Sequence, residues 1–173
     1  MTKQEIISEN PMRKIRIEKV SLSAGGKDKD LEKAAKLLHI LSGMKSQIIS
    51  SDKRIPDFDV SPGIEVGTRV TIRGEEALKI LSRLLAALDN TLSRKKIAEN
   101  HFSFGIKEYI EISGIEYQRD IGIRGLNVDV VFARSGERIK RRKIKRGKLP
   151  AKQRISKSEI IKFMEENFKT SFI

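Results

Sequence analysis

A strand with one buried face followed by an amphipathic helix occurs twice in this sequence, and this pairing restricts the fold more than any other feature. In residues 65–73 apolar and polar side chains alternate, which predicts a strand in a half-buried sheet. Residues 75–92 then carry acids in the first turn and leucines at helical spacing. The apolar faces of the two elements must cover each other, so the unit predicts helices on a sheet. The helical stripe consists of Leu78, Leu81, Leu85, Leu88 and Leu92.

The other unit occupies residues 13–42. The apolar positions of its strand change parity between Ile17 and Val20, as they would at a β-bulge. The helix that follows is predicted to begin with Asp30 as its cap and to end at Gly43. The sequences of the two units match too poorly to indicate a duplication. The apolar stripe of this helix consists of Leu31, Ala34, Ala35, Leu38 and Leu41.

The rest of the chain completes an α+β pattern. The sequence S156-K-S-E159 is a capping box, and Ile155 and Ile160 are placed for a hydrophobic staple. We therefore expect one domain over residues 1–173, with a mostly antiparallel sheet and helices on one face. The other predicted elements are a loose lead-in at 1–11, a short strand at 47–50, strands at 102–106 and 125–134, turns at 112–125 and a C-terminal helix at 156–168.

The positive charge of the chain is concentrated in one segment. The 36 Lys and Arg residues and 23 Asp and Glu residues give a net charge of +13, but without residues 138–154 the balance is 26 bases against 23 acids. That segment has no acid, and we call it the basic segment. Its ten bases are Arg138, Lys140, Arg141, Arg142, Lys143, Lys145, Arg146, Lys148, Lys152 and Arg154.

The composition disfavours catalysis and metal binding. The absence of Cys excludes disulfides, thiolate catalysis and thiolate zinc sites. His39 lies within a predicted helix and His101 in a loop before a strand, and the acids near residue 110 are scattered through turns. The fragment G25-G-K27 lacks the rest of a phosphate-binding loop. We expect no enzyme, no cofactor and no metal.

No apolar run is long enough to span a membrane, and the N-terminus lacks the apolar core of a secretory signal. We therefore expect a soluble, cytoplasmic protein with no membrane partner.

Three interpretations of the basic segment compete: a solvated tail, a nuclear address and a nucleic-acid contact. The segment lies between a predicted strand and a capped helix, so both of its ends are held and ordering it on a partner costs less entropy. This favours nucleic acid. The sequence has no helix-turn-helix, zinc-finger or aromatic RNA-recognition motif, so shape and backbone recognition of structured RNA fits best.

Several motifs together resemble one known family, the universal large-subunit ribosomal protein called "five", which binds 5S rRNA, in its archaeal and eukaryotic form. The resemblance covers nearly the whole chain and implies the same α+β fold. The motifs are N10-P-M-R-K-I-R-I-E-K-V20, I55-P-D-F58, V66-G-T-R-V-T-I-R-G74, F102-S-F-G-I-K-E-Y-I110 and I121-G-I-R-G-L126.

The resemblance implies a structural role in the ribosome and no catalysed reaction. It implies attachment of 5S rRNA to the large-subunit rRNA in the central protuberance, together with a 5S-associated large-subunit protein. It also implies a bridge to a small-subunit head protein and contact with peptidyl-site tRNA.

The family's RNA-reading positions are carried over residue by residue. Thr71 and Arg73 match the exposed sheet face that reads 5S rRNA, and Asn10, Met12, Arg13 and Lys14 match an N-terminal segment that reaches RNA. Two further positions depart from the family pattern, because Ser23 stands in place of Asn and Met44 in place of Gln; Lys45 or Gln47 could replace the lost hydrogen bonds.

A loop at 53–62 matches the tRNA-facing loop of the family. Asp57, Asp59 and the lack of a base at Pro56 make it less positive than usual. The alternative to the whole family assignment is a general nucleic-acid-coating protein in which the basic segment does the binding; an enzyme acting on RNA is a remote third interpretation. The tRNA-facing positions are Lys53, Arg54, Ile55, Pro56, Asp57 and Phe58.

Overall fold

The computed structural model describes residues 11–173. Five strands form an antiparallel sheet in the order β2-β3-β1-β6-β5. The strands are β1 (Arg16–Gly25), β2 (Gln47–Ser50), β3 (Glu65–Ile72), β5 (His101–Ile106) and β6 (Leu126–Ala133). The helices are α2 (Asp28–Ser42), α3 (Glu75–Ala86), α4 (Arg138–Arg141) and α5 (Lys157–Phe168). Short 3-10 turns are η1 (Pro11–Arg13), η2 (Pro56–Phe58), η3 (Arg94–Lys96), η4 (Tyr109–Glu111) and η5 (Ala151–Gln153).

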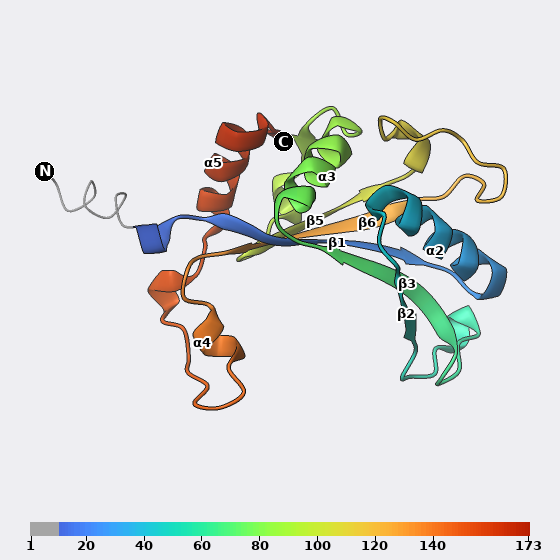
Figure 1. Cartoon of the computed structure of the whole chain (residues 1–173), viewed down its shortest axis with the longest axis horizontal. Coiled ribbons are helices and arrows are strands. Elements are labelled where there is room, and N and C mark those ends of the chain that lie inside the picture. The colour runs from blue at the N-terminus through green and yellow to red at the C-terminus, as the bar shows by residue number, and fades with distance from the viewer. Residues whose placement is uncertain (1–10) are drawn as a thin grey trace, which may run out of the picture.

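Helices α2, α3 and α5 lie on one face of the sheet, and the core lies between them and the strands (Figure 1). Alternate residues of each strand point into this core, as the period of two requires. The rings of Phe102 and Phe132 are stacked with centroids 5.7 Å apart, and Phe163 of α5 packs edge-on against Phe132. The predicted α+β fold, with a mostly antiparallel sheet and helices on one face, is confirmed.

Several local predictions are confirmed as well. The pairing of β1 with β6 shifts register between Ile17 and Lys19, which is the predicted bulge. Gly43 ends α2 in the left-handed conformation with φ of 66°, and its N–H donates to the His39 carbonyl. Ser156 and Glu159 form the predicted capping box.

Two predicted helix ends are wrong. Helix α2 begins at Asp28, after Lys27 at the N-cap, and Asp30 does not cap it; the Asp30 carboxylate instead accepts a 2.6 Å hydrogen bond from Arg124. Helix α3 ends at Ala86 rather than near residue 92, because the chain then turns through left-handed backbone at Asp89 and Asn90.

The leucine stripe of α3 is therefore also partly wrong. Leu78 is 43% exposed, and Leu92 lies outside the helix in β4 (Thr91–Leu92), which pairs in parallel with β7 (Ser171–Phe172). The helix face that packs on the core consists of Ala77, Leu81, Leu84 and Leu85.

Candidate RNA-binding surface

The sheet face opposite the three covering helices, here called the open face, carries small polar side chains in register. The strand pairing places Ser23 of β1 between Arg69 of β3 and Asn127 of β6. Gln47 extends this row beyond Arg69, and Gly105 extends it beyond Asn127. One line of residues, polar except for Gly105, thus crosses all five strands, because residues paired directly across a sheet share a face.

A second row runs parallel to the first, two residues along each strand. Ser21 lies between Thr71 and Asp129, and Ser103 follows Asp129. The Ser21 and Thr71 hydroxyl oxygens are 3.2 Å apart and hydrogen-bonded. A depression of about 410 Å³ lies over the β1, β6 and β5 part of the two rows.

The chemistry of the open face suits direct reading of nucleotides rather than simple attraction of phosphate. Hydroxyl, amide and carboxylate groups donate to and accept from base edges and 2′-hydroxyls. Short side chains such as Ser21, Ser23 and Ser103 leave room for a nucleic-acid strand to approach the sheet. Arg69 and Arg73 add positive charge on β3 and at its end, and both are exposed.

The predicted reading residues fall into two groups. Thr71 and Ser23 lie on the open face, and Arg73 directly follows the last residue of β3. Met44 follows α2, and its half-buried side chain packs against the hydrophobic core, while Lys45 beside it is exposed.

Sequence reasoning missed several members of the open face. Their signal was present, since each occupies the exposed parity of a strand whose other parity is apolar. Which strands are neighbours, and hence which polar residues share a row, depends on the topology. The missed residues are Ser21, Arg69, Ser103, Asn127 and Asp129.

The N-terminal segment lies beside the root of the basic segment. Met12 and Arg13 belong to η1, and Lys14 follows it with an exposed side chain. A Cβ at Gly136 would lie 3.7 Å from the Met12 terminal methyl carbon, so η1 is close to the end of β6. Asn10 lies outside the described residues.

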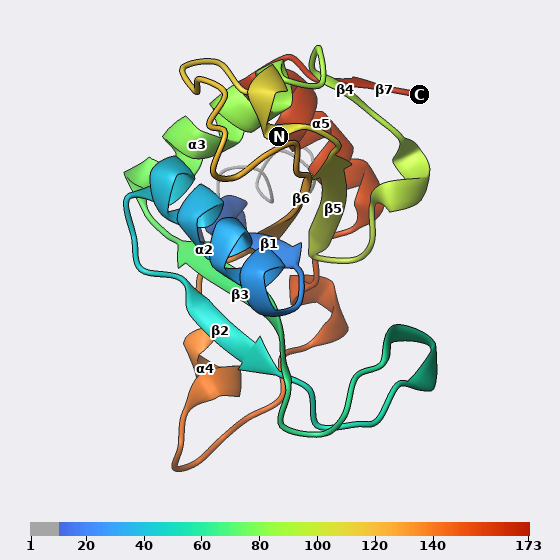
Figure 2. The same cartoon turned by 90° about the vertical axis from the view of Figure 1, so that its right-hand side faces the viewer.

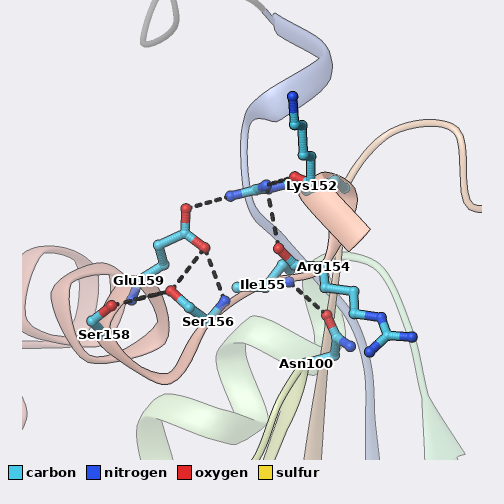
Figure 3. A network of polar contacts seen from close by, with 8 residues as sticks. Asn100, Lys152, Arg154, Ile155, Ser156, Ser158 and Glu159 are labelled. Carbon is cyan, nitrogen blue, oxygen red and sulfur yellow. Dashed lines mark hydrogen bonds and ion pairs between the residues drawn. The ribbon is translucent and has the colours of Figure 1, made fainter. Parts of the chain in front are cut away.

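The basic segment is tethered at both ends. Arg134, whose side chain is only 4% exposed, donates to the carbonyls of Lys152 (3.2 Å) and Arg154 (3.5 Å) and to the Glu159 carboxylate (2.6 Å). Gln153 donates to the Ser135 carbonyl at 3.0 Å. Figure 3 shows how this network joins the end of the segment to the start of α5.

A second tether holds the start of the segment. Arg141 forms ion pairs with Glu18 of β1 and with Glu137, and its hydrogen bond with Glu18 raises the pKa of Arg141. All ten bases of the segment are nonetheless exposed. Apart from Arg141 and Arg154, which lies 3.7 Å from Glu99, none of them forms an ion pair with an acid of residues 11–173. Eight cations are thus available to an external anion.

The loop between β2 and β3 projects past the sheet on the side away from the covering helices, and so does the basic segment (Figures 1 and 2). The two loops therefore flank the open face. In the β2–β3 loop, Ile55 and Val60 form an isolated bridge, and Lys27 donates to the Phe58 carbonyl. The side chains of residues 53–58 are all exposed, and the Phe58 side chain is 70% exposed.

Within residues 11–173 no group of three or more His, Asp or Glu side chains is arranged to hold a metal ion. No helix in that part of the chain is both long and apolar enough to span a bilayer.

Comparison with known proteins decides the family. A model of the C-terminal part of the uL5 ribosomal protein family matches residues 65–163. Large ribosomal subunit protein uL5 of Nanoarchaeum equitans is 41% identical over 168 residues, which cover 95% of this chain and 99% of that protein. The chain belongs to the uL5 family of large-subunit ribosomal proteins. The uL5 proteins of Archaeoglobus fulgidus and Sulfolobus acidocaldarius are 38% and 34% identical, over 91% and 100% of this chain and 90% and 99% of theirs.

Membership of the uL5 family confirms the resemblance seen in the sequence. The protein is a structural component of the large ribosomal subunit and not an enzyme. The family model spans β3, part of the open face and the whole basic segment, so both parts of the candidate surface contain residues that the family model matches.

Replacing Glu159 with Gln should lower the free energy of unfolding by about 2 kcal/mol at pH 7. Loss of one partner of a fully buried ion pair costs about 3 to 5 kcal/mol, and we expect less here because Glu159 is partly exposed. Urea unfolding measures the difference, and Glu165→Gln on the exposed side of α5 is the matched control, expected to change stability by under about 0.5 kcal/mol.

The effect of Glu159→Gln should depend on pH. Burial raises the pKa of Glu159, but hydrogen bonds from the Ser156 backbone and from Arg134 outweigh it and leave the pKa below the ordinary 4.5. The ionised carboxylate therefore stabilises the fold fully above that ordinary value, and this contribution is lost as the pH falls through the lowered folded-state pKa. A wild-type advantage that stayed constant down to pH 2 would contradict the assigned ion pair.

Proposed function

We propose that this uL5 protein binds 5S rRNA through the open face and the N-terminal segment, and that it attaches 5S rRNA to the large-subunit rRNA in the central protuberance. Thr71, Arg73 and Ser23 contact the 5S rRNA, with Met12, Arg13 and Lys14 at its margin. Asn10 is proposed for the same contact from the sequence alone.

The observation that carries the proposal is the pair of polar rows on the open face. A sheet face that only covered a core or faced water would have no need for hydroxyl, amide and guanidinium groups aligned over five strands without a covering layer. Sequence-specific contacts to RNA require such donors and acceptors on a surface wide enough for a folded strand. The rows centred on Ser21 and Ser23 supply them.

The basic segment supplies the second contact, to the large-subunit rRNA. Its available cations neutralise phosphates, and phosphate contacts position an RNA without reading its sequence. Because Arg134 and Arg141 hold its ends, the segment presents these charges at a fixed place beside the open face.

The β2–β3 loop is our proposed contact with peptidyl-site tRNA. Lys53 and Arg54 face the backbone, and the exposed ring of Phe58 offers a stacking surface. Asp57 and Asp59 reduce the charge of the loop, so this contact is weaker than that of the basic segment. A 5S-associated large-subunit protein and a small-subunit head protein complete the proposed set of neighbours.

The full-length protein, immobilised and exposed to total RNA from its own cells at moderate salt, should retain 5S rRNA in preference to tRNA of similar charge density. Retention in proportion to abundance alone would favour the alternative, a basic protein that coats nucleic acid without regard to sequence.

A further inference from the structure

A cavity lies at the root of the basic segment and is separate from the open face. Its volume is about 370 Å³, at the small end of the roughly 300 to 1,000 Å³ that small-molecule sites occupy. The end of β6 forms one wall and residues 146–154 form the other. The cavity is therefore large enough for one nucleotide and too small for a base pair.

The lining of the cavity combines positive charge with an apolar wall. Lys140, Arg146 and Lys148 contribute cations from the segment, and Ala133 and Leu149 contribute apolar side chains. Glu137 is the one acid in the lining, against five Lys and Arg residues. An inorganic anion needs only the cations, whereas a nucleotide uses the cations for its phosphate and the apolar wall for its base.

The cavity is held open by contacts within the chain. Arg146 donates through Nε to the Lys140 carbonyl at 2.7 Å, and the Gly147 N–H donates to the Ile139 carbonyl at 3.2 Å. Both bonds fold the loop back on α4 and fix the outer wall. Such a preformed site avoids much of the ordering cost that a flexible loop would incur on binding.

A buried donor also lines the cavity. Arg134 uses both of its terminal nitrogens in the tether, but its Nε is buried and has no hydrogen-bond partner among the described residues. Buried polar atoms without partners are rare in folded proteins, and an unmet N–H at a cavity wall fits a ligand with acceptor atoms.

We infer that this cavity receives a single nucleotide extruded from an RNA helix, with its phosphate on Lys140 and Lys148 and its base against Leu149 and Ala133. The inference rests on the proposed contact of the basic segment with rRNA. Extruding a nucleotide costs least where it is already unpaired, so the preferred target is a helix with a single-nucleotide bulge.

The test uses two RNA hairpins that differ only by one bulged nucleotide, bound to the full chain at fixed salt. Wild-type protein should bind the bulged hairpin about tenfold more tightly, since stacking one base contributes on the order of 1 to 3 kcal/mol. Leu149→Phe fills the cavity without changing charge and should remove the preference while leaving affinity for the paired hairpin unchanged.

Two charge variants separate the cavity from the surface. Lys148→Ala should weaken the bulged hairpin more than the paired one, whereas Lys143→Ala, which removes the same charge outside the cavity, should weaken both equally. Thermal melting of each variant checks that the fold is retained. A Lys148→Ala variant that behaved like Lys143→Ala would overturn the inference even if Leu149→Phe failed to fold.

Further outcomes distinguish this inference from the function on which it rests. Equal and tight binding of wild type to both hairpins would overturn the nucleotide site and leave the RNA contact of the basic segment standing. Absence of binding to either hairpin would overturn both. Displacement of the bulged hairpin by micromolar nucleoside 5′-monophosphate would overturn the extruded nucleotide as the ligand, because the cavity would then serve free nucleotides.

Discussion

Replacing Thr71 and Arg73 together with alanine should weaken binding to 5S rRNA by at least about 30-fold, with a much smaller effect on unrelated structured RNA. Each lost contact to a base or to the backbone is worth about 1 to 3 kcal/mol, and two such losses of 1 kcal/mol already give this factor. Both side chains are exposed, so the melting temperature should change little.

The control for this double variant is Lys79→Ala, which removes one exposed cation from α3 on the covered side of the sheet. It should lower the affinity for both RNAs slightly and equally. If the Thr71 and Arg73 variant also lost affinity for both RNAs in equal proportion, the open face would contribute charge but no reading of sequence. Binding is measured by titration at one fixed salt concentration, because affinities at different salt cannot be compared.

Replacing four cations of the basic segment with glutamine should reduce the affinity for every RNA and flatten its dependence on salt. Each phosphate contact contributes about 0.7 to 0.9 to the slope of log affinity against log salt, so four contacts change the slope by about 3. This corresponds to roughly 10³-fold weaker binding at 0.1 M salt than the same variant comparison gives at 1 M. The residues replaced are Arg138, Arg142, Lys143 and Lys145.

A matched variant removes four exposed lysines from the covering helices, at Lys29, Lys36, Lys79 and Lys162. It has the same net charge as the segment variant, and it should keep most of the slope if the phosphates meet the segment. Identical slopes for the two variants would mean that the RNA responds to the total charge of the protein, which is the behaviour of a general coating protein.

The elements that the sequence predicted well are those with a local cause. The alternation of residues 65–72 and the capping box at Ser156 and Glu159 each depend on neighbours within a few residues, and both are confirmed. The bulge near Ile17 is visible in the sequence because one extra residue in a strand moves every later side chain to the opposite face.

The errors arose where a distant contact overrides local preference. Asp30 is a good capping residue by type, but Arg124, 94 residues away, takes its carboxylate. Leu92 continues the leucine spacing of α3, yet it pairs with Phe172 near the C-terminus. No pattern within a helical window reports such partners.

The same distinction applies to the candidate RNA surface. The charge of residues 138–154 was evident in the sequence, but its tether was not, because Arg134 looked like an ordinary polar end of a strand. The rows of the open face needed the strand order β2-β3-β1-β6-β5, and the cavity needed Asn100, β6 and the basic segment to meet. The RNA roles of all these residues stay predictions.

The most direct test of recognition by the open face is a salt titration of the full-length protein against its own 5S rRNA, a scrambled RNA of equal length and a DNA duplex. We predict saturable one-to-one binding that favours 5S rRNA and keeps this preference as salt rises, because the hydrogen bonds of the open face are screened less than phosphate contacts. Equal affinities for the three nucleic acids that fall together with rising salt would contradict recognition by the open face.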